Sequence, residues 1–250
     1  MRHLDLFSGI GGFALAARNV GWETVAFCEI DSYCQRVLAK HWPDVPIYGD
    51  IRTFNGLECD LITGGYPCQP FSLAGVRRGD GDPRHLWPEA FRLVRELRPS
   101  RAVFENVAGH ITMGLDAVLS DLEGIGYTCE TFVIPACAVD APHRRDRVWI
   151  ICHSNRDRKS DVPIHAAVSK LQNVDDTNSA HGERGRLSSR TQQKHSDIGG
   201  DGRWQAEPGV GRVANGIPNR VDRLRALGNA IVPQVAEVIF KAINEANKQA

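Results

Sequence analysis

Short apolar runs alternate with amphipathic stretches along residues 1–152. Compact apolar runs bounded by glycine, proline or polar residues are typical of buried strands. We therefore expect strands at residues 3–7, 24–28, 59–63, 101–104, 127–134 and 147–152.

Between these runs, apolar residues recur at the spacing of three and four that marks one face of a helix. Asp31 is a suitable N-cap for a helix that reaches residue 41, and a further helix is expected over residues 86–97. Another helix should cover residues 115–122, and a last one should begin at Pro233 and pack back onto the first domain. Regular alternation of strand and helix predicts an α/β fold, with a mostly parallel sheet covered by helices on both faces.

Residues 153–203 break this pattern, because they contain few apolar residues and no Phe, Tyr or Trp. We expect an insertion with little core of its own, followed by a small packed unit that begins near Trp204. The predicted organisation is a catalytic and cofactor-binding domain at 1–152, a small and partly flexible target-recognition region at 153–222, and a C-terminal segment with its helix at 223–250.

Charge is unevenly distributed along the chain, although the formal net charge is zero. Residues 142–225 hold 16 Lys and Arg against 10 Asp and Glu, so they carry +6 and the rest of the chain carries −6. A basic segment on an acidic body is expected where one lobe faces phosphate, although such a stretch can equally be a solvated surface.

The cysteines and the length of the apolar runs indicate the cellular compartment. Seven cysteines, none in a Cys-x-x-Cys pair, fit neither a zinc ribbon nor a disulfide framework. We expect six to be small buried thiols in a reducing compartment, with Cys68 as the exception. No run approaches the ~18 uninterrupted apolar residues of a membrane span, and we predict a cytoplasmic protein.

A glycine-rich turn follows the first expected strand, in the sequence Asp-Leu-Phe-Ser-Gly-Ile-Gly-Gly-Phe at 5–13. Glycines there would let a ligand approach the backbone closely, although the glycines of an ordinary tight turn would give the same sequence. Glu29 follows the second strand, where an acid can bind a ribose diol, and Asp50 could accept from an adenine amino group.

Two prolines bracket Cys68 in the segment Gly-Gly-Tyr-Pro-Cys-Gln-Pro-Phe-Ser at 64–72. Proline fixes φ, so the loop is stiff, as a nucleophile that must align with its target requires. Residues 77–84, rich in Gly, Arg and Asp, are typical of a flap over a site.

Three charged residues complete the candidate chemistry. Glu105 follows an expected strand, and if buried it could hold and donate a proton, although such a Glu is more often a helix cap or a surface residue. Arg145 and Arg147 are spaced to share one face of a strand, where they could steady a carboxylate or form a salt-bridged edge.

In this order along the chain, these segments resemble the motifs of the cytosine-C5 DNA methyltransferase family. Residues 5–13 resemble its first cofactor motif, 64–72 its catalytic motif, 105–107 the motif with the base-binding Glu, and 227–233 its C-terminal motif. The resemblance covers roughly residues 1–152 and 215–245, and the short form is similar to phage- or prophage-type members. His143 stands where the family usually has Gln, which leaves the role of that position open.

The resemblance implies a class I S-adenosylmethionine-dependent methyltransferase fold of the Rossmann-like type, and methyl transfer to carbon 5 of a cytosine flipped out of double-stranded DNA. Cys68 would be the covalent nucleophile, Glu105 would bind the ring N3 edge, and Arg145 and Arg147 would orient Glu105 and the base. The implied cofactor contacts are Phe7, Ser8, Gly9, Gly11, Gly12, Glu29, Ile30, Asp50, Ile51, Pro67, Asn229 and Ile231, and the implied DNA contacts are Gln69, Ser72 and Arg84. No metal is expected, since the methyl donor is already cationic, and a monomer is the default.

Three alternatives stay open on the sequence alone. The same core could methylate cytosine in tRNA. The chain could be a degenerate methylase that holds nucleic acid without chemistry, or a non-catalytic protein that binds S-adenosylmethionine. The target sequence and any restriction partner cannot be deduced from these residues.

Overall fold

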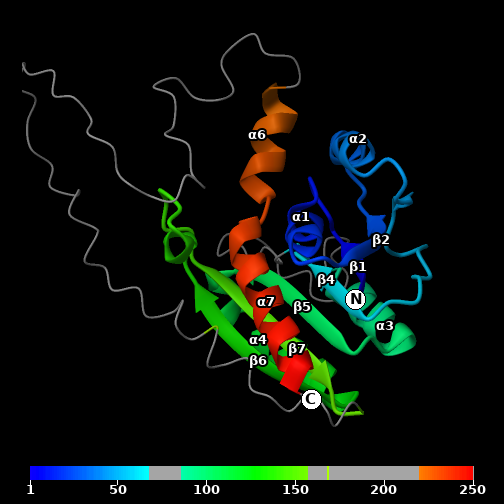
Figure 1. The fold of residues 1–250 in the computed structure, drawn as a ribbon, viewed down its shortest axis with the longest axis vertical. Helices are drawn as coiled ribbons and strands as arrows, with labels where there is room; N and C mark the ends of the chain where they lie inside the picture. The colour runs from blue at the N-terminus through cyan, green and yellow to red at the C-terminus, as the bar shows by residue number, and fades with distance from the viewer. Residues whose placement is uncertain (68–85, 157–167, 169–219, 250) are drawn as a thin grey trace, which may run out of the picture.

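Within the described residues the strands form one seven-stranded sheet, in the order β3-β2-β1-β4-β5-β7-β6. The computed structural model describes residues 1–67, 86–156, 168 and 220–249 (Figure 1). The strands are β1 (Arg2–Leu6), β2 (Glu23–Cys28), β3 (Ile47–Tyr48), β4 (Leu61–Gly64), β5 (Arg101–Val107), β6 (Tyr127–Ile134) and β7 (Arg147–Ser154).

The sheet is mostly parallel, as predicted. Strand β1 pairs in parallel with β2 and β4, β2 with β3, and β4 with β5. Only β7 among the described strands runs against its neighbours β5 and β6. The carboxyl ends of β1, β2, β4 and β5 therefore meet at one edge of the sheet, where ligands of open α/β sheets bind.

The helices expected from apolar spacing are present, and their bounds agree with the predictions to within about two residues, as is usual for helix ends. Asp31 caps α2, as predicted, because its side chain accepts from the backbone N–H groups of Tyr33 and Cys34. Helix α6, which was not expected, precedes the last helix and spans the predicted boundary between residues 222 and 223. The helices are α1 (Gly12–Asn19), α2 (Ser32–His41), α3 (Trp87–Leu97), α4 (Leu115–Gly124), α6 (Arg220–Asn229) and α7 (Pro233–Gln249), with short 3₁₀ helices η2 (Ala108–Thr112) and η3 (Ala136–Val139).

Helices cover both faces of the sheet because side chains alternate along each buried strand. On β5, Ala102 and Phe104 join a core cluster with α3 and α4, whereas Val103 joins a cluster with α1 and α7. Figure 1 shows α7 beside α1, lying across the green strands. The prediction that the last helix packs back on the first domain is therefore confirmed.

The stretch Val221–Lys248 has the length and composition of a membrane span, with a mean hydropathy of 1.3 over its most apolar window. In the α7 part of this stretch, Val235, Ile239, Phe240 and Ile243 are at most 2% exposed and lie inside the molecule. These side chains pack with α1 and the sheet, which is the burial pattern of a core helix in a globular domain.

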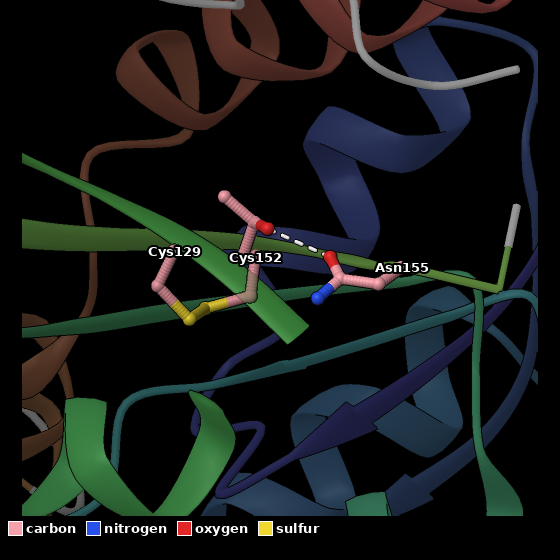
Figure 2. The surroundings of a disulfide bond; sticks show 4 residues. Cys129, Cys152 and Asn155 are labelled. Carbon is pink, nitrogen blue, oxygen red and sulfur yellow. Dashed lines mark hydrogen bonds between the residues drawn. A yellow bond between two sulfur atoms is a disulfide. The ribbon is translucent and has the colours of Figure 1, made fainter. Parts of the chain in front are cut away.

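The structure contains a disulfide between Cys129 and Cys152 (Figure 2). The two residues lie directly opposite each other on the antiparallel strands β6 and β7, with their Cα atoms 4.2 Å apart. The expectation that six cysteines are unpaired thiols is therefore wrong for these two. Spacing along the chain could not reveal the pair, because the cysteines are 23 positions apart and only the strand register brings them together.

Candidate active site

The glycine-rich turn between β1 and α1 has an unusual backbone. Phe7, Gly9 and Gly11 all have positive φ, at 51°, 53° and 86°. Such a value is uncommon for a residue other than glycine, and a backbone held in this conformation often lies at a functional site. Gly12 has a different constraint, because an added Cβ would lie 2.6 Å from Cγ1 of Ile231. The turn is thus packed directly against the C-terminal segment.

Glu29 connects the turn to the end of β2. One carboxylate oxygen accepts from the backbone N–H of Gly9 and the other from that of Asp31, both at 2.7 Å. Ser8 directs its hydroxyl back to the carbonyl of Asp5 at 2.7 Å. These bonds fix the turn and leave further lone pairs on the buried carboxylate for a ligand.

The next residues along this edge border open space. Ile30 follows Glu29 and is 69% exposed, which is unusual for a large apolar side chain beside a buried acid. Asp50 lines a cavity of about 210 Å³ with Tyr48, Gly49 and Phe54. The carboxylate of Asp50 also accepts from the backbone N–H of Arg52 at 3.0 Å.

The remaining predicted cofactor contacts differ in their settings. Ile51 is 4% exposed and packs in the core. Asn229 is exposed at the end of α6, and Pro67 is the last described residue before the predicted nucleophile.

Glu105 lies on β5 at the same edge of the sheet, and only 8% of the residue is exposed. Arg147, the first residue of β7, places its Nε 2.9 Å from one carboxylate oxygen of Glu105. The other oxygen lies beside Gly65, where an added Cβ would be 3.5 Å from it. Burial raises the pKa of Glu105 to about 7, against the opposing effect of the positive charges of Arg147 and Arg145. A carboxyl group with such a pKa can hold or release a proton near neutral pH.

Arg145 lies in a different position from the one its spacing suggested. It lies before β7 with φ of 44°, so the prediction that Arg145 and Arg147 share one face of a strand is wrong. Its guanidinium donates to the carbonyls of Gly228 and Ala230, both at 2.8 Å. The left-handed backbone turns the side chain away from the ladder and onto the junction between α6 and α7.

Two polar residues that the sequence had not singled out complete this edge. Tyr66 and His110 are buried and joined by a hydrogen bond of 2.8 Å between the phenolic oxygen and Nε2. Asn106 donates from its side-chain amide to the carbonyl of Tyr66 at 3.2 Å. Their signal in the sequence was weak, because a Tyr before Pro-Cys and a His after the strand read equally well as core residues.

Several predicted residues lie outside the described part of the chain. These are the nucleophile Cys68, the DNA contacts Gln69, Ser72 and Arg84, the flap at 77–84, and most of the basic segment at 142–225. His143 is described and exposed at the surface.

The sheet order, with one antiparallel strand next to its edge, and the glycine-rich turn after β1 define a class I S-adenosylmethionine-dependent methyltransferase fold. The chain matches the family described as C-5 cytosine-specific DNA methylase over residues 1–205. It belongs to this family.

Individual relatives agree with this assignment. The chain is 38% identical over 159 residues to the type II methyltransferase M.HgiCII of Herpetosiphon aurantiacus, a match that covers 60% of this chain and 36% of the relative. It is 33% identical over 200 residues to the type II methyltransferase M.AquIA of a Picosynechococcus strain, covering 69% of this chain and 80% of the relative. The chain thus spans only about a third of the Herpetosiphon protein but most of the cyanobacterial one.

Among solved structures, the fold is similar to an E. coli protein described as a DNA modification methyltransferase encoded within a prophage. The TM-score is 0.58 with 26% identity, over 67% of this chain and 50% of the other.

Proposed function

We propose that the protein transfers a methyl group from S-adenosylmethionine to carbon 5 of cytosine in double-stranded DNA. The observation that carries this proposal is the buried Glu105, paired with Arg147 and adjacent to Gly65, three residues before Cys68. This carboxyl group can bind the edge of a pyrimidine close to a cysteine nucleophile. The curated relatives described above are type II DNA methyltransferases by name.

The residues at the carboxyl ends of β1, β2 and β3 fit S-adenosylmethionine. The turn borders open space at Gly9, where an added Cβ would meet nothing within 4 Å. Glu29 would accept from the ribose hydroxyls, the exposed Ile30 would cover one face of the adenine, and Asp50 would accept from its amino group. The bound cofactor supplies an electrophilic methyl group on a sulfonium.

Carbon 5 of cytosine is a poor nucleophile, and the proposed role of Cys68 is to activate it covalently. Its thiolate would add to carbon 6, which makes carbon 5 an enamine carbon. Carbon 5 would then take the methyl group as the methyl–sulfur bond breaks, and S-adenosylhomocysteine would be the leaving group. Loss of the carbon-5 proton to a base and expulsion of the Cys68 thiolate then give 5-methylcytosine.

Glu105 would stabilise the addition by a hydrogen bond at ring N3. Because burial keeps its pKa at about 7, a substantial fraction of Glu105 is protonated near neutral pH and can donate to that nitrogen. Arg147 holds the carboxyl group in place by its contact with the other side of the group. The target base must leave the stacked duplex to reach this edge, at a cost of a few kcal/mol.

The test is transfer of labelled methyl groups from S-adenosylmethionine to unmethylated DNA of mixed sequence, with tRNA assayed in parallel, followed by bisulfite sequencing of the DNA. We expect label at carbon 5 of cytosine in DNA, at a recognition site that the sequencing would reveal. The Cys68→Ala variant should lose turnover and keep DNA binding, because the thiol takes part in chemistry rather than in docking.

The matched control is Cys137→Ala, which removes a free and partly exposed cysteine from η3. This variant should retain activity. Undiminished methylation by Cys68→Ala would contradict the mechanism. Label in tRNA alone would move the substrate to RNA, and label in neither would leave a nucleic-acid or cofactor binder without chemistry.

A further inference from the structure

The ladder between β4 and β5 ends before the catalytic residues. The last paired positions are Gly64 and Phe104, so Gly65–Pro67 and Glu105 lie beyond the backbone hydrogen bonds that join the two strands. Beyond that point, among the described residues, β5 pairs only with β7. Side chains must therefore set the distance between the segment that enters Cys68 and the carboxyl group of Glu105.

Two contacts from the end of β5 hold Tyr66. Its backbone carbonyl accepts from Nδ2 of Asn106 at 3.2 Å, and the Oδ1 of Asn106 in turn accepts from the backbone N–H of Val107 at 2.9 Å. Its phenolic oxygen bonds Nε2 of His110 on η2 at 2.8 Å. Both ends of Tyr66 are thus attached to the segment that follows Glu105, the backbone through the end of β5 and the side chain through η2.

The two side chains of the Tyr66–His110 bond are buried among aromatic rings. Tyr66 is 4% exposed and His110 is 7% exposed, and the tyrosine ring packs against Trp87 and Phe104 with centroids 5.1 and 6.0 Å away. Burial lowers the pKa of His110, so the imidazole is neutral at neutral pH and offers one donor and one acceptor. In this apolar setting, loss of either partner leaves the other polar group unsatisfied.

A purely apolar pair would fill the same space, and therefore packing alone does not require these two residue types. We infer that Tyr66 and His110 are a positioning pair for the proposed methyl transfer, which holds the backbone entering Cys68 at a fixed distance from Glu105. The inference rests on the proposed function and assigns the pair no contact with substrate or cofactor.

The first variant is Tyr66→Phe, which removes the hydroxyl and keeps the ring. Its control is Tyr127→Phe, since Tyr127 is a second buried tyrosine with a hydrogen-bonded hydroxyl. That hydroxyl donates to the carbonyl of Pro99 at 2.6 Å, at the opposite end of the sheet. The single-turnover rate is measured with saturating DNA and cofactor, together with the cofactor Kd and the free energy of unfolding. Adduct formation is followed with DNA that carries 5-fluorocytosine, where the fluorine at carbon 5 cannot leave as a proton does.

We expect Tyr66→Phe to slow both methyl transfer and adduct formation by roughly tenfold, because misplacement of a reacting group by ~1 Å can cost about 100-fold. The cofactor Kd should stay unchanged. Tyr127→Phe should lower the free energy of unfolding by a similar amount and keep the wild-type rate. At position 110, His110→Gln should recover part of the rate that His110→Phe loses, and Tyr66→Phe combined with His110→Phe should be no slower than the slower single variant.

A wild-type rate in folded Tyr66→Phe would overturn the inference and leave the proposed function intact. Equal slowing by Tyr127→Phe would likewise reduce the pair to a structural role. Absence of methyl transfer to DNA by the wild-type chain would overturn the proposed function and the inference together.

Discussion

Two buried glutamates at the same edge of the sheet are held in different ways. Glu29 and Glu105 are each 8% exposed. Glu29 is held by two backbone N–H groups, whereas Glu105 is held by the guanidinium of Arg147. Backbone donors are fixed by the fold, and both carboxylate oxygens of Glu29 accept from them. Burial raises the pKa of Glu105 to about 7, so this carboxyl group can hold or release a proton near neutral pH.

Burial alone therefore does not distinguish the two glutamates, since both are equally buried. The identity of the partners separates the glutamate that anchors a turn from the one that can exchange a proton. Substitutions at the two sites should therefore affect different steps of the reaction.

The largest effect is expected for Glu105→Gln. Loss of the ionisable group should lower the single-turnover rate by roughly 100- to 10,000-fold, the usual range for a general acid or base. Cofactor affinity should be retained, as measured by calorimetry. Glu29→Gln should instead raise the cofactor Kd by about 10- to 100-fold, because a hydrogen-bond acceptor for the cofactor is lost. If Glu105→Gln weakened the cofactor more than the rate, Glu105 would belong to the cofactor site.

The pH dependence of kcat/KM tests the proposed role of Glu105 further. The pKa of Glu105 is raised, and the protonated form is the proposed donor, so kcat/KM should fall as pH rises through about 7. This alkaline limb should disappear in Glu105→Gln. Arg147→Gln removes a positive charge that lowers the pKa, so the limb should move upward by about one unit. The same variant should lower the plateau by roughly tenfold through misplacement of the carboxyl group.

Arg147→Lys provides the matched control for the charge. It keeps a cation near Glu105 and loses the planar guanidinium. The limb should therefore stay near its wild-type pH while the plateau falls. An unmoved limb in Arg147→Gln would show that the ion pair does not set the pKa.

A smaller effect is expected for Arg145→Gln. Its two bonds to the carbonyls of Gly228 and Ala230 should be worth about 1–3 kcal/mol in the free energy of unfolding, because a charged donor is lost. The rate should fall only a few-fold, since Arg145 holds the junction of α6 and α7. Denaturant unfolding and the methylation assay measure the two quantities. A rate loss as large as that of Arg147→Gln would place Arg145 in contact with the base.

The smallest effect is expected for Arg225→Gln, which breaks the ion pair between α6 and Asp31. The Arg225 side chain is 56% exposed, and such pairs contribute about 0.2–1 kcal/mol. The cofactor Kd should rise by no more than about fivefold, and the difference from wild type should shrink in high salt. A salt-independent loss would mean that Arg225 acts through something other than the ion pair.

Much of the fold followed from the sequence because local patterns carry it. Apolar runs and helical spacing predicted six of the strands and the helices α2, α3, α4 and α7, since each buries a face that repeats along the chain. Helix α6 escaped the pattern because its apolar residues Val221, Leu224 and Leu227 are exposed.

The candidate site divides in the same way between local and long-range information. Motif order along the chain predicted the glycine-rich turn, Glu29, Glu105 and Arg147 as candidate site residues, because each lies close to the end of a strand at the edge where ligands of such sheets bind. The backbone conformation at Arg145, which sends that side chain to α6, has no signal in residue spacing. The opposition of Cys129 and Cys152 depends on the register of β6 and β7.

The class of fold and the residue types that the proposed chemistry needs follow from residue order, because periodicity and motifs are properties of short segments. The contacts between those residues follow from the way the segments pack in space. The family resemblance implied the contact of Arg147 with Glu105, and no pattern implied the pairing of Tyr66 with His110. Both depend on how segments distant along the chain end beside each other. The free energy of burying a charged or polar group depends on what lies around it, and the order of residues does not specify those surroundings.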